Sequence, residues 1–143
     1  MNTEKHRSDE AENSEEYLHA DITRCVIGVF DDVYNELGFG FLESVYQSAM
    51  EVALQEAGLK VCRFVKVPVW FRGRVIADLM VEDVVFLELK AVRTLDPAHE
   101  SQLLNYMRAT PIEVGLLLNF GTKPQVKRLI YDNPRKRHRG IPD

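Results

Sequence analysis

The chain has 143 residues, of which 45% are hydrophobic and 28% charged, and its formal net charge is −4. This length and composition are typical of one globular domain that can bury a core without disulfides or structural metal. No apolar run approaches the roughly 18 residues of a membrane span, and the polar N-terminus shows no secretory signal, so we expect a cytoplasmic protein with no membrane partner.

The negative charge belongs to one end of the chain. Residues 1–16 contain six acidic side chains against two basic ones, which is −4, and subtracting this from the total of −4 leaves zero. These residues are polar and lack hydrophobic periodicity, which predicts a disordered acidic tail. Residues 134–143 are a basic run that we interpret as a solvated tail, the alternative being contact with a phosphate backbone. The folded, neutral domain is expected over residues 17–133.

Two helices are predicted before the first strand. Apolar residues recur at helical spacing over residues 22–37, and Gly38 follows as a stop signal. A second apolar stripe covers residues 42–57 and is closed by Gly58. Within it we interpret Tyr46 as a buried, hydrogen-bonded structural side chain rather than a catalytic one.

Three β-rich stretches follow, at residues 59–71, 75–81 and 84–92. The charged pair Glu82-Asp83 is predicted to form the turn between the last two. Pro68 indicates that the first stretch is an edge strand or is interrupted there.

A helix and two strands are expected in the C-terminal part. Asp96 fits a helix N-cap and Pro97 the first helical position, so a helix should run from there to about Ala109. The continuous apolar run at 112–121 predicts a strand covered on both faces, and residues 126–133 a last short strand. The element order is that of an α/β sandwich.

The two cysteines, Cys25 and Cys62, lie in apolar patterns and lack the spacing of a metal site. We expect both to be reduced core residues. A disulfide between them is the less favoured alternative.

Charged residues interrupt the apolar stretch DLMVEDVVFLELK, residues 78–90. Residues two apart in a strand share a face, so Glu88 and Lys90 should point the same way. A strict two-residue turn would pair Asp78 with Leu87. A three-residue loop, or two residues plus a bulge, would pair Asp78 with Glu88.

In the second register two carboxylates and an ammonium converge. Hard oxygen ligands of this kind suit Mg²⁺ or Mn²⁺, which can polarise a phosphoryl oxygen and activate water. Lys90 would then orient the water or stabilise charge on the phosphoryl oxygens. The alternative is that these charges form only the solvated polar face of a half-buried hairpin.

Five blocks carry a resemblance to a known family. The first is GFGFLESVYQSAM, with Gly40, Glu43 and Tyr46 in the order G-x-x-E-x-x-Y, and it is followed by ADLMVED, FLELKAV, SQLLNYM and LLLNFG. Over about residues 20–133 the chain resembles the GxxExxY protein family of the PD-(D/E)XK nuclease superfamily. The resemblance implies a restriction-endonuclease-like core, α-β-β-β-α-β, in which a mixed central sheet is flanked by helices.

The resemblance also implies roles for site residues. The Asp of the second strand and the Glu of E-x-K bind the metal and the Lys assists catalysis, which places these roles on Asp78, Glu88 and Lys90. Glu43 matches an additional acidic metal ligand in the helix before the sheet. Its alternative is a glutamate on the helix surface or at the favourable helix N-terminus.

Gln102 matches a glutamine that faces the site in a subset of these nucleases, from the helix after E-x-K. It shares a helical stripe with His99 and Tyr106. The packing stripe of the same helix is predicted to consist of Leu103, Leu104 and Met107.

The sequence therefore predicts a Mg²⁺- or Mn²⁺-dependent nuclease that hydrolyses phosphodiester bonds of DNA or RNA. The alternative is a catalytically silent nuclease fold that binds nucleic acid or protein. Small size and neutral charge favour the alternative, whereas the intact E-x-K favours the enzyme, because a binding module has no chemical need for that lysine. Trp70 and Phe71 are candidates for a homodimer interface or for edge-strand core packing, and the sequence leaves both open.

Overall fold

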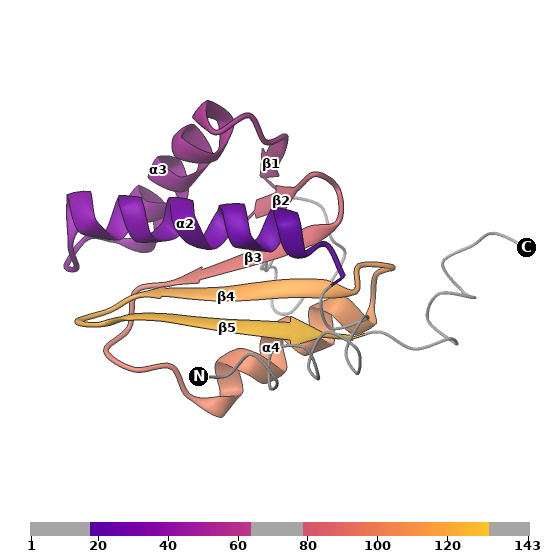
Figure 1. The fold of residues 1–143 in the computed structure, drawn as a ribbon. Coiled ribbons are helices and arrows are strands. Elements are labelled where there is room, and N and C mark those ends of the chain that lie inside the picture. The colour runs from indigo at the N-terminus through magenta and orange to yellow at the C-terminus, as the bar shows by residue number, and fades with distance from the viewer. Residues whose placement is uncertain (1–17, 64–78, 132–143) are drawn as a thin grey trace, which may run out of the picture.

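The computed structural model describes residues 18–63 and 79–131, which form a mixed five-stranded sheet flanked by helices (Figure 1). The elements are α2 (Ala20–Leu37), α3 (Glu43–Glu56), β1 (Val61–Arg63), β2 (Leu79–Val81), β3 (Val85–Lys90), α4 (Pro97–Arg108), β4 (Val114–Phe120) and β5 (Pro124–Ile130). This order confirms the predicted succession of helices and strands. Several predictions fall outside the described residues: both tails, Pro68, Trp70, Phe71 and Asp78.

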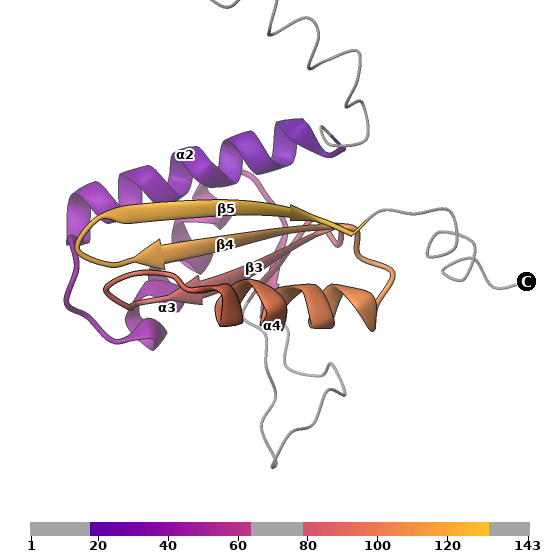
Figure 2. The same ribbon diagram turned by 90° about the horizontal axis from the view of Figure 1, so that it is seen from below.

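The strands lie side by side in chain order, β1-β2-β3-β4-β5, and only β3 and β4 are parallel. A parallel pair needs a crossover connection, which α4 supplies. Figure 2 shows α2 and α4 on opposite sides of the sheet. All seven residues of β4 are buried, which confirms the strand covered on both faces. Among the described residues no helix has the length and apolarity needed to cross a membrane.

Side chains of β3 alternate between two cores. Leu87 and Leu89 pack in the larger core, beneath α2 and α3. Phe86 packs in the smaller core, against α4. Because residues two apart share a face, Glu88 and Lys90 continue the Phe86 face and lie on the α4 side.

Tyr46 fixes the connection between α2 and α3. Its side chain is fully buried, and its hydroxyl donates to the Gly38 carbonyl (2.6 Å) and accepts from the Phe41 N–H (3.3 Å). Its ring stacks on Phe120 of β4, with centroids 4.0 Å apart. The predicted structural role of Tyr46 is confirmed.

Both cysteines are free, as expected. Cys25 packs against the larger core, whereas Cys62 is exposed, so the core position predicted for Cys62 is wrong. Cys62 belongs to β1, which within residues 18–63 and 79–131 is an edge strand paired with β2, and two of its three residues are exposed.

The last strand begins at Pro124, two residues before the predicted start. Proline is tolerated as the first residue of an edge strand because its missing N–H leaves no ladder hydrogen bond unmade.

His19 weakens the start of α2. It occupies the N-cap with φ 58° and makes no side-chain capping hydrogen bond. Burial, and next the charge of Arg128, lowers the pKa of His19 below its usual value of 6.5. The His19 side chain therefore binds a proton more readily in the unfolded chain than in the folded one. As a result, the free energy of unfolding falls as the pH drops below 6.5 toward the folded-state pKa.

We expect His19→Asn to raise the free energy of unfolding by about 1 kcal/mol at neutral pH, because asparagine tolerates the left-handed region and is a good N-cap. The variant should also lose less stability than wild type on acidification. Urea unfolding of both proteins across this pH range measures the two effects. An identical pH profile would assign the loss to other groups.

Candidate functional site

The turn between β2 and β3 sets the register of the site. The Val84 N–H donates to the Val81 carbonyl (3.1 Å), with Glu82 and Asp83 at the central positions and φ of 53° and 61°. Lys60 holds both acids: its N–H donates to the Glu82 carboxylate and its ammonium pairs with Asp83, each at 2.7 Å. The predicted turn residues are confirmed, with Val84 as the extra residue.

This three-residue connection places Leu79 opposite Leu87. It excludes the strict two-residue turn, which would have shifted every pair by one residue. The observed register is the one that the metal-binding hypothesis required of the hairpin. Asp78 itself lies outside the described residues, so its place opposite Glu88 stays a prediction.

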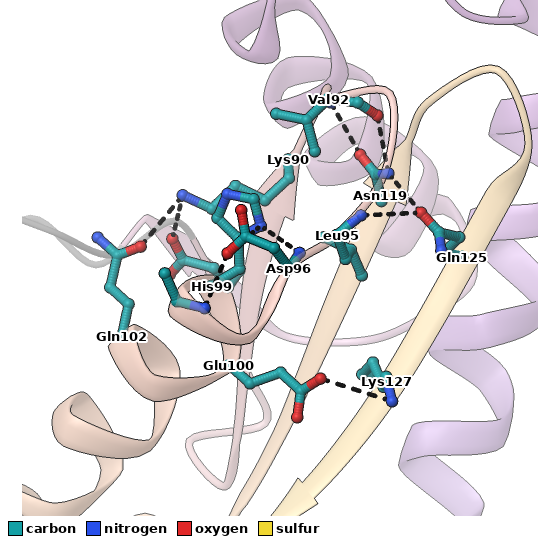
Figure 3. A network of polar contacts seen from close by, with 12 residues as sticks. Lys90, Val92, Leu95, Asp96, His99, Glu100, Gln102, Asn119, Gln125 and Lys127 are labelled. Carbon is teal, nitrogen blue, oxygen red and sulfur yellow. Dashed lines mark hydrogen bonds and ion pairs between the residues drawn. The ribbon is translucent and has the colours of Figure 1, made fainter.

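Glu88, Lys90 and Gln102 meet between β3 and α4. The Lys90 ammonium lies 3.4 Å from the Glu88 carboxylate and donates to the Gln102 side-chain carbonyl at 3.3 Å. Figure 3 shows Lys90 and Gln102 pointing toward one another. Gln102 thus contacts Lys90, and its role in a functional site stays a prediction.

Glu88 and Lys90 do not form a surface ion pair. The side chain of Glu88 is 6% exposed and that of Lys90 is 15% exposed, so the solvated-face alternative is wrong for both. A buried charge is tolerated only when it is paired and hydrogen-bonded. The structure therefore holds a carboxylate and an ammonium in a largely dehydrated position.

Asn119 fixes the backbone that follows Lys90, and sequence analysis missed it. Its fully buried amide accepts from the Val92 N–H and donates to the Val92 carbonyl, both at 2.9 Å, and also donates to Gln125 (2.8 Å). Gln125 in turn accepts from the Leu95 N–H at 3.2 Å (Figure 3). The one signal was a polar residue inside an otherwise apolar run.

Because Gly121 has no side chain, the connection after β4 can approach the backbone of Val92. A β-carbon at position 121 would lie 2.2 Å from the Val92 carbonyl oxygen, so the approach excludes every other residue type. The Tyr34 hydroxyl of α2 donates to the Gly121 carbonyl (2.7 Å) and lies 2.9 Å from that of Thr122. The connection after β4 is thus tied both to α2 and to the connection after β3.

The start of α4 is capped as predicted. The Asp96 carboxylate accepts from the Ala98 N–H (2.8 Å), and Nδ1 of His99 accepts from the Asp96 N–H (3.1 Å). This reciprocal capping satisfies N–H groups that the first helical turn leaves open. His99 therefore orients the helix that presents Gln102.

The predicted division of α4 into two stripes is wrong for Tyr106. Its side chain is 2% exposed and packs edge-on against Phe86 (4.8 Å) in the core that also contains Leu103 and Met107. Leu104, assigned to the packing stripe, is only half-buried. Positions three apart lie on one helix face, so Tyr106 follows Leu103 into the core.

Glu43 is the first residue of α3 and is exposed. Its helix packs on the other side of the sheet from α4. Within residues 18–63 and 79–131 no three His, Cys, Asp or Glu side chains gather as a metal site. Of the ligands expected there, only Glu88 is placed in the buried site.

A family model described as "PD-(D/E)XK nuclease superfamily" matches residues 20–129, which run from the start of α2 almost to the end of β5. Neither a curated protein nor a solved structure matches the chain.

Proposed function

The chain belongs to the PD-(D/E)XK nuclease superfamily, and on this premise we propose that it is a metal-dependent nuclease acting on phosphodiester bonds of DNA or RNA. Its five-stranded sheet with flanking helices is consistent with the restriction-endonuclease-like α/β fold of that superfamily. Within the superfamily we assign the chain to the GxxExxY proteins, on the motif formed by Gly40, Glu43 and Tyr46.

The dehydrated contact between Glu88 and Lys90 carries this proposal. A protein that only needed stability would gain as much from an apolar pair at these positions. An ammonium beside a buried carboxylate, with Gln102 to orient it, suits a reaction in which negative charge grows on phosphoryl oxygens.

We propose that the metal is Mg²⁺ or Mn²⁺, held by Glu88 and Asp78; the family motif adds Glu43 as a third ligand, although its helix packs on the sheet face opposite to that of Glu88. Carboxylate oxygens are hard ligands, and the Glu88 carboxylate fits such a cation. Asp78 enters the proposal from the superfamily motif, as the aspartate that precedes E-x-K. A bound metal would supply Lewis-acid activation of water and phosphate.

Each protein group then has one task. Glu88 supplies negative charge at the metal position. Lys90 stabilises charge on the phosphoryl oxygens or orients the attacking water. Gln102 accepts a hydrogen bond from Lys90 and limits the positions of its ammonium.

The test is to follow cleavage of labelled single- and double-stranded DNA and RNA by the full chain with Mg²⁺, with Mn²⁺ and with EDTA. Calorimetric titration of the same metals gives their affinity. We expect cleavage of at least one substrate with metal and none with EDTA. Metal binding without cleavage of any substrate would favour the catalytically silent module.

Removing the side-chain carbonyl of Gln102 should slow catalysis without removing the metal. We expect Gln102→Leu to lower kcat by about 10-fold at saturating Mg²⁺, as loss of an orienting partner does, with nearly unchanged metal affinity. Ser101→Ala, at an exposed neighbouring position of α4, is the control and should keep wild-type kcat. Equal kcat in both variants would remove Gln102 from the mechanism.

A further inference from the structure

A hollow of about 250 Å³ lies beside the candidate site. Three chain segments line it: the connection between α2 and α3, the residues after β3, and the end of β4 with the two residues that follow it. One lining residue, Ala91, follows Lys90 directly, so their Cα atoms are about 3.8 Å apart. The hollow thus lies at the C-terminal end of β3, the strand that carries Glu88 and Lys90.

Three phenylalanines, Phe39, Phe41 and Phe120, are among the residues that line this hollow. Phe39 is 59% exposed and Phe41 is 46% exposed, which is unusual for side chains of that size. Phe120, 1% exposed, lines the inner part and is held there by stacking on Tyr46. The hollow therefore offers ring faces that are available to a ligand.

Size and charge define the ligand further. The hollow is smaller than the ~300–1,000 Å³ of pockets that enclose drug-sized molecules, and it suits one planar ring system. Among the described residues that line it, Arg93 is the charged one, and its exposed guanidinium can contact a phosphate. A planar ring attached to a phosphate is the chemistry of a nucleotide.

We propose that this hollow binds one unpaired nucleobase of the substrate, and that the substrate is accordingly single-stranded nucleic acid. The inference rests on the proposed nuclease function, which makes a nucleic acid the ligand. A base in the hollow stacks on Phe39 or Phe41, its phosphate meets Arg93, and the adjoining phosphodiester lies at the Lys90 end of β3. A base inside a duplex has its faces covered by its neighbours and enters only after it is flipped out.

The experiment measures binding in EDTA, where a metal-dependent nuclease cannot cut. Fluorescence anisotropy gives the Kd of the full chain for a labelled single strand, for its duplex and for the same strand with abasic positions, each as DNA and as RNA. Phe39→Ala tests the ring, and Val52→Ala, 55% exposed on α3 and outside the hollow, is the matched control. Both side chains are exposed enough for the fold to survive their truncation.

We expect the intact single strand to bind more tightly than the duplex. Phe39→Ala should weaken that binding by about 5- to 140-fold, the range for losing one stacked base, while Val52→Ala binds like wild type. The abasic strand should bind wild type as weakly as the intact strand binds Phe39→Ala. The DNA and RNA arms identify which sugar the site accepts.

Equal affinity for single strand and duplex, no binding to any strand, or equal effects of the two variants would overturn the inference. So would sedimentation showing that Phe39→Ala separates a dimer while its oligonucleotide Kd is unchanged, because a second copy would then occupy the hollow. Base-dependent binding without cleavage would refute the nuclease but keep the base site. Cleavage at a rate that Phe39→Ala leaves unchanged would support the nuclease but refute the base site.

Discussion

Replacing Glu88 with glutamine is expected to abolish metal binding and to lower metal-dependent cleavage by about 10³-fold or more, since the metal supplies several kcal/mol of charge stabilisation at about 1.4 kcal/mol per factor of ten. Glutamine has the shape of glutamate and lacks its charge. The measurements are calorimetric Mg²⁺ titration and single-turnover cleavage.

Glu100→Gln is the matched control for this variant. Glu100 lies on α4 and is 33% exposed, and its carboxylate is 3.5 Å from the Lys127 ammonium (Figure 3). The same loss of charge there should leave metal affinity and cleavage at wild-type values. Wild-type cleavage by Glu88→Gln would refute the proposed role of Glu88.

Stability must be measured alongside activity. Glu88→Gln leaves the partly buried Lys90 without a full negative partner, and breaking a fully buried pair can cost about 3–5 kcal/mol. Thermal unfolding in EDTA shows whether the variant is folded. Glu88→Asp keeps the charge but withdraws it by one methylene, so it provides a second test if the glutamine variant unfolds.

Gly121→Ala is expected to have the largest effect on stability. Its β-carbon would lie 2.2 Å from the Val92 carbonyl oxygen, and this backbone is fixed in turn by Asn119. The chain must therefore move the connection after β3 or lose the Asn119 hydrogen bonds. We expect a loss of about 3 kcal/mol or more in the free energy of unfolding, together with reduced cleavage.

Gly28→Ala, in contrast, should raise the free energy of unfolding. Gly28 lies inside α2, is exposed, and a β-carbon there meets nothing within 4 Å. Alanine is the better helix former, so this variant should gain up to about 1 kcal/mol. Urea unfolding of both variants gives the comparison, and a neutral Gly121→Ala would show that the contact around Val92 is not tight.

The sequence predicted the parts of the site that depend on local rules. Strand alternation placed Glu88 and Lys90 on one face, and the turn residues and the Asp96 cap were also found. Local rules do not reveal that Asn119 reaches a neighbouring connection, because that contact depends on the parallel pairing of β3 and β4. The role of Asp78 stays a prediction from sequence, and that of Glu43 rests on the family motif.

Misassignments arose where tertiary packing decides between equivalent patterns. Tyr106 and Leu104 both fit an apolar helix face, and the position of the sheet selected Tyr106. Cys62 stands in an apolar pattern, but its strand lies at an edge with little cover. Periodicity identifies a face and not the element that covers it.

The β3–α4–β4 crossover brings Glu88, Lys90, Gln102 and Asn119 from one uninterrupted stretch of chain, because each of these elements follows the last in sequence. The chain segments that separate these residues are short, so bringing the residues together costs little conformational entropy. The α2–α3 connection and the β2–β3 turn lie outside this stretch in sequence, so a change in either leaves all four of these residues in place.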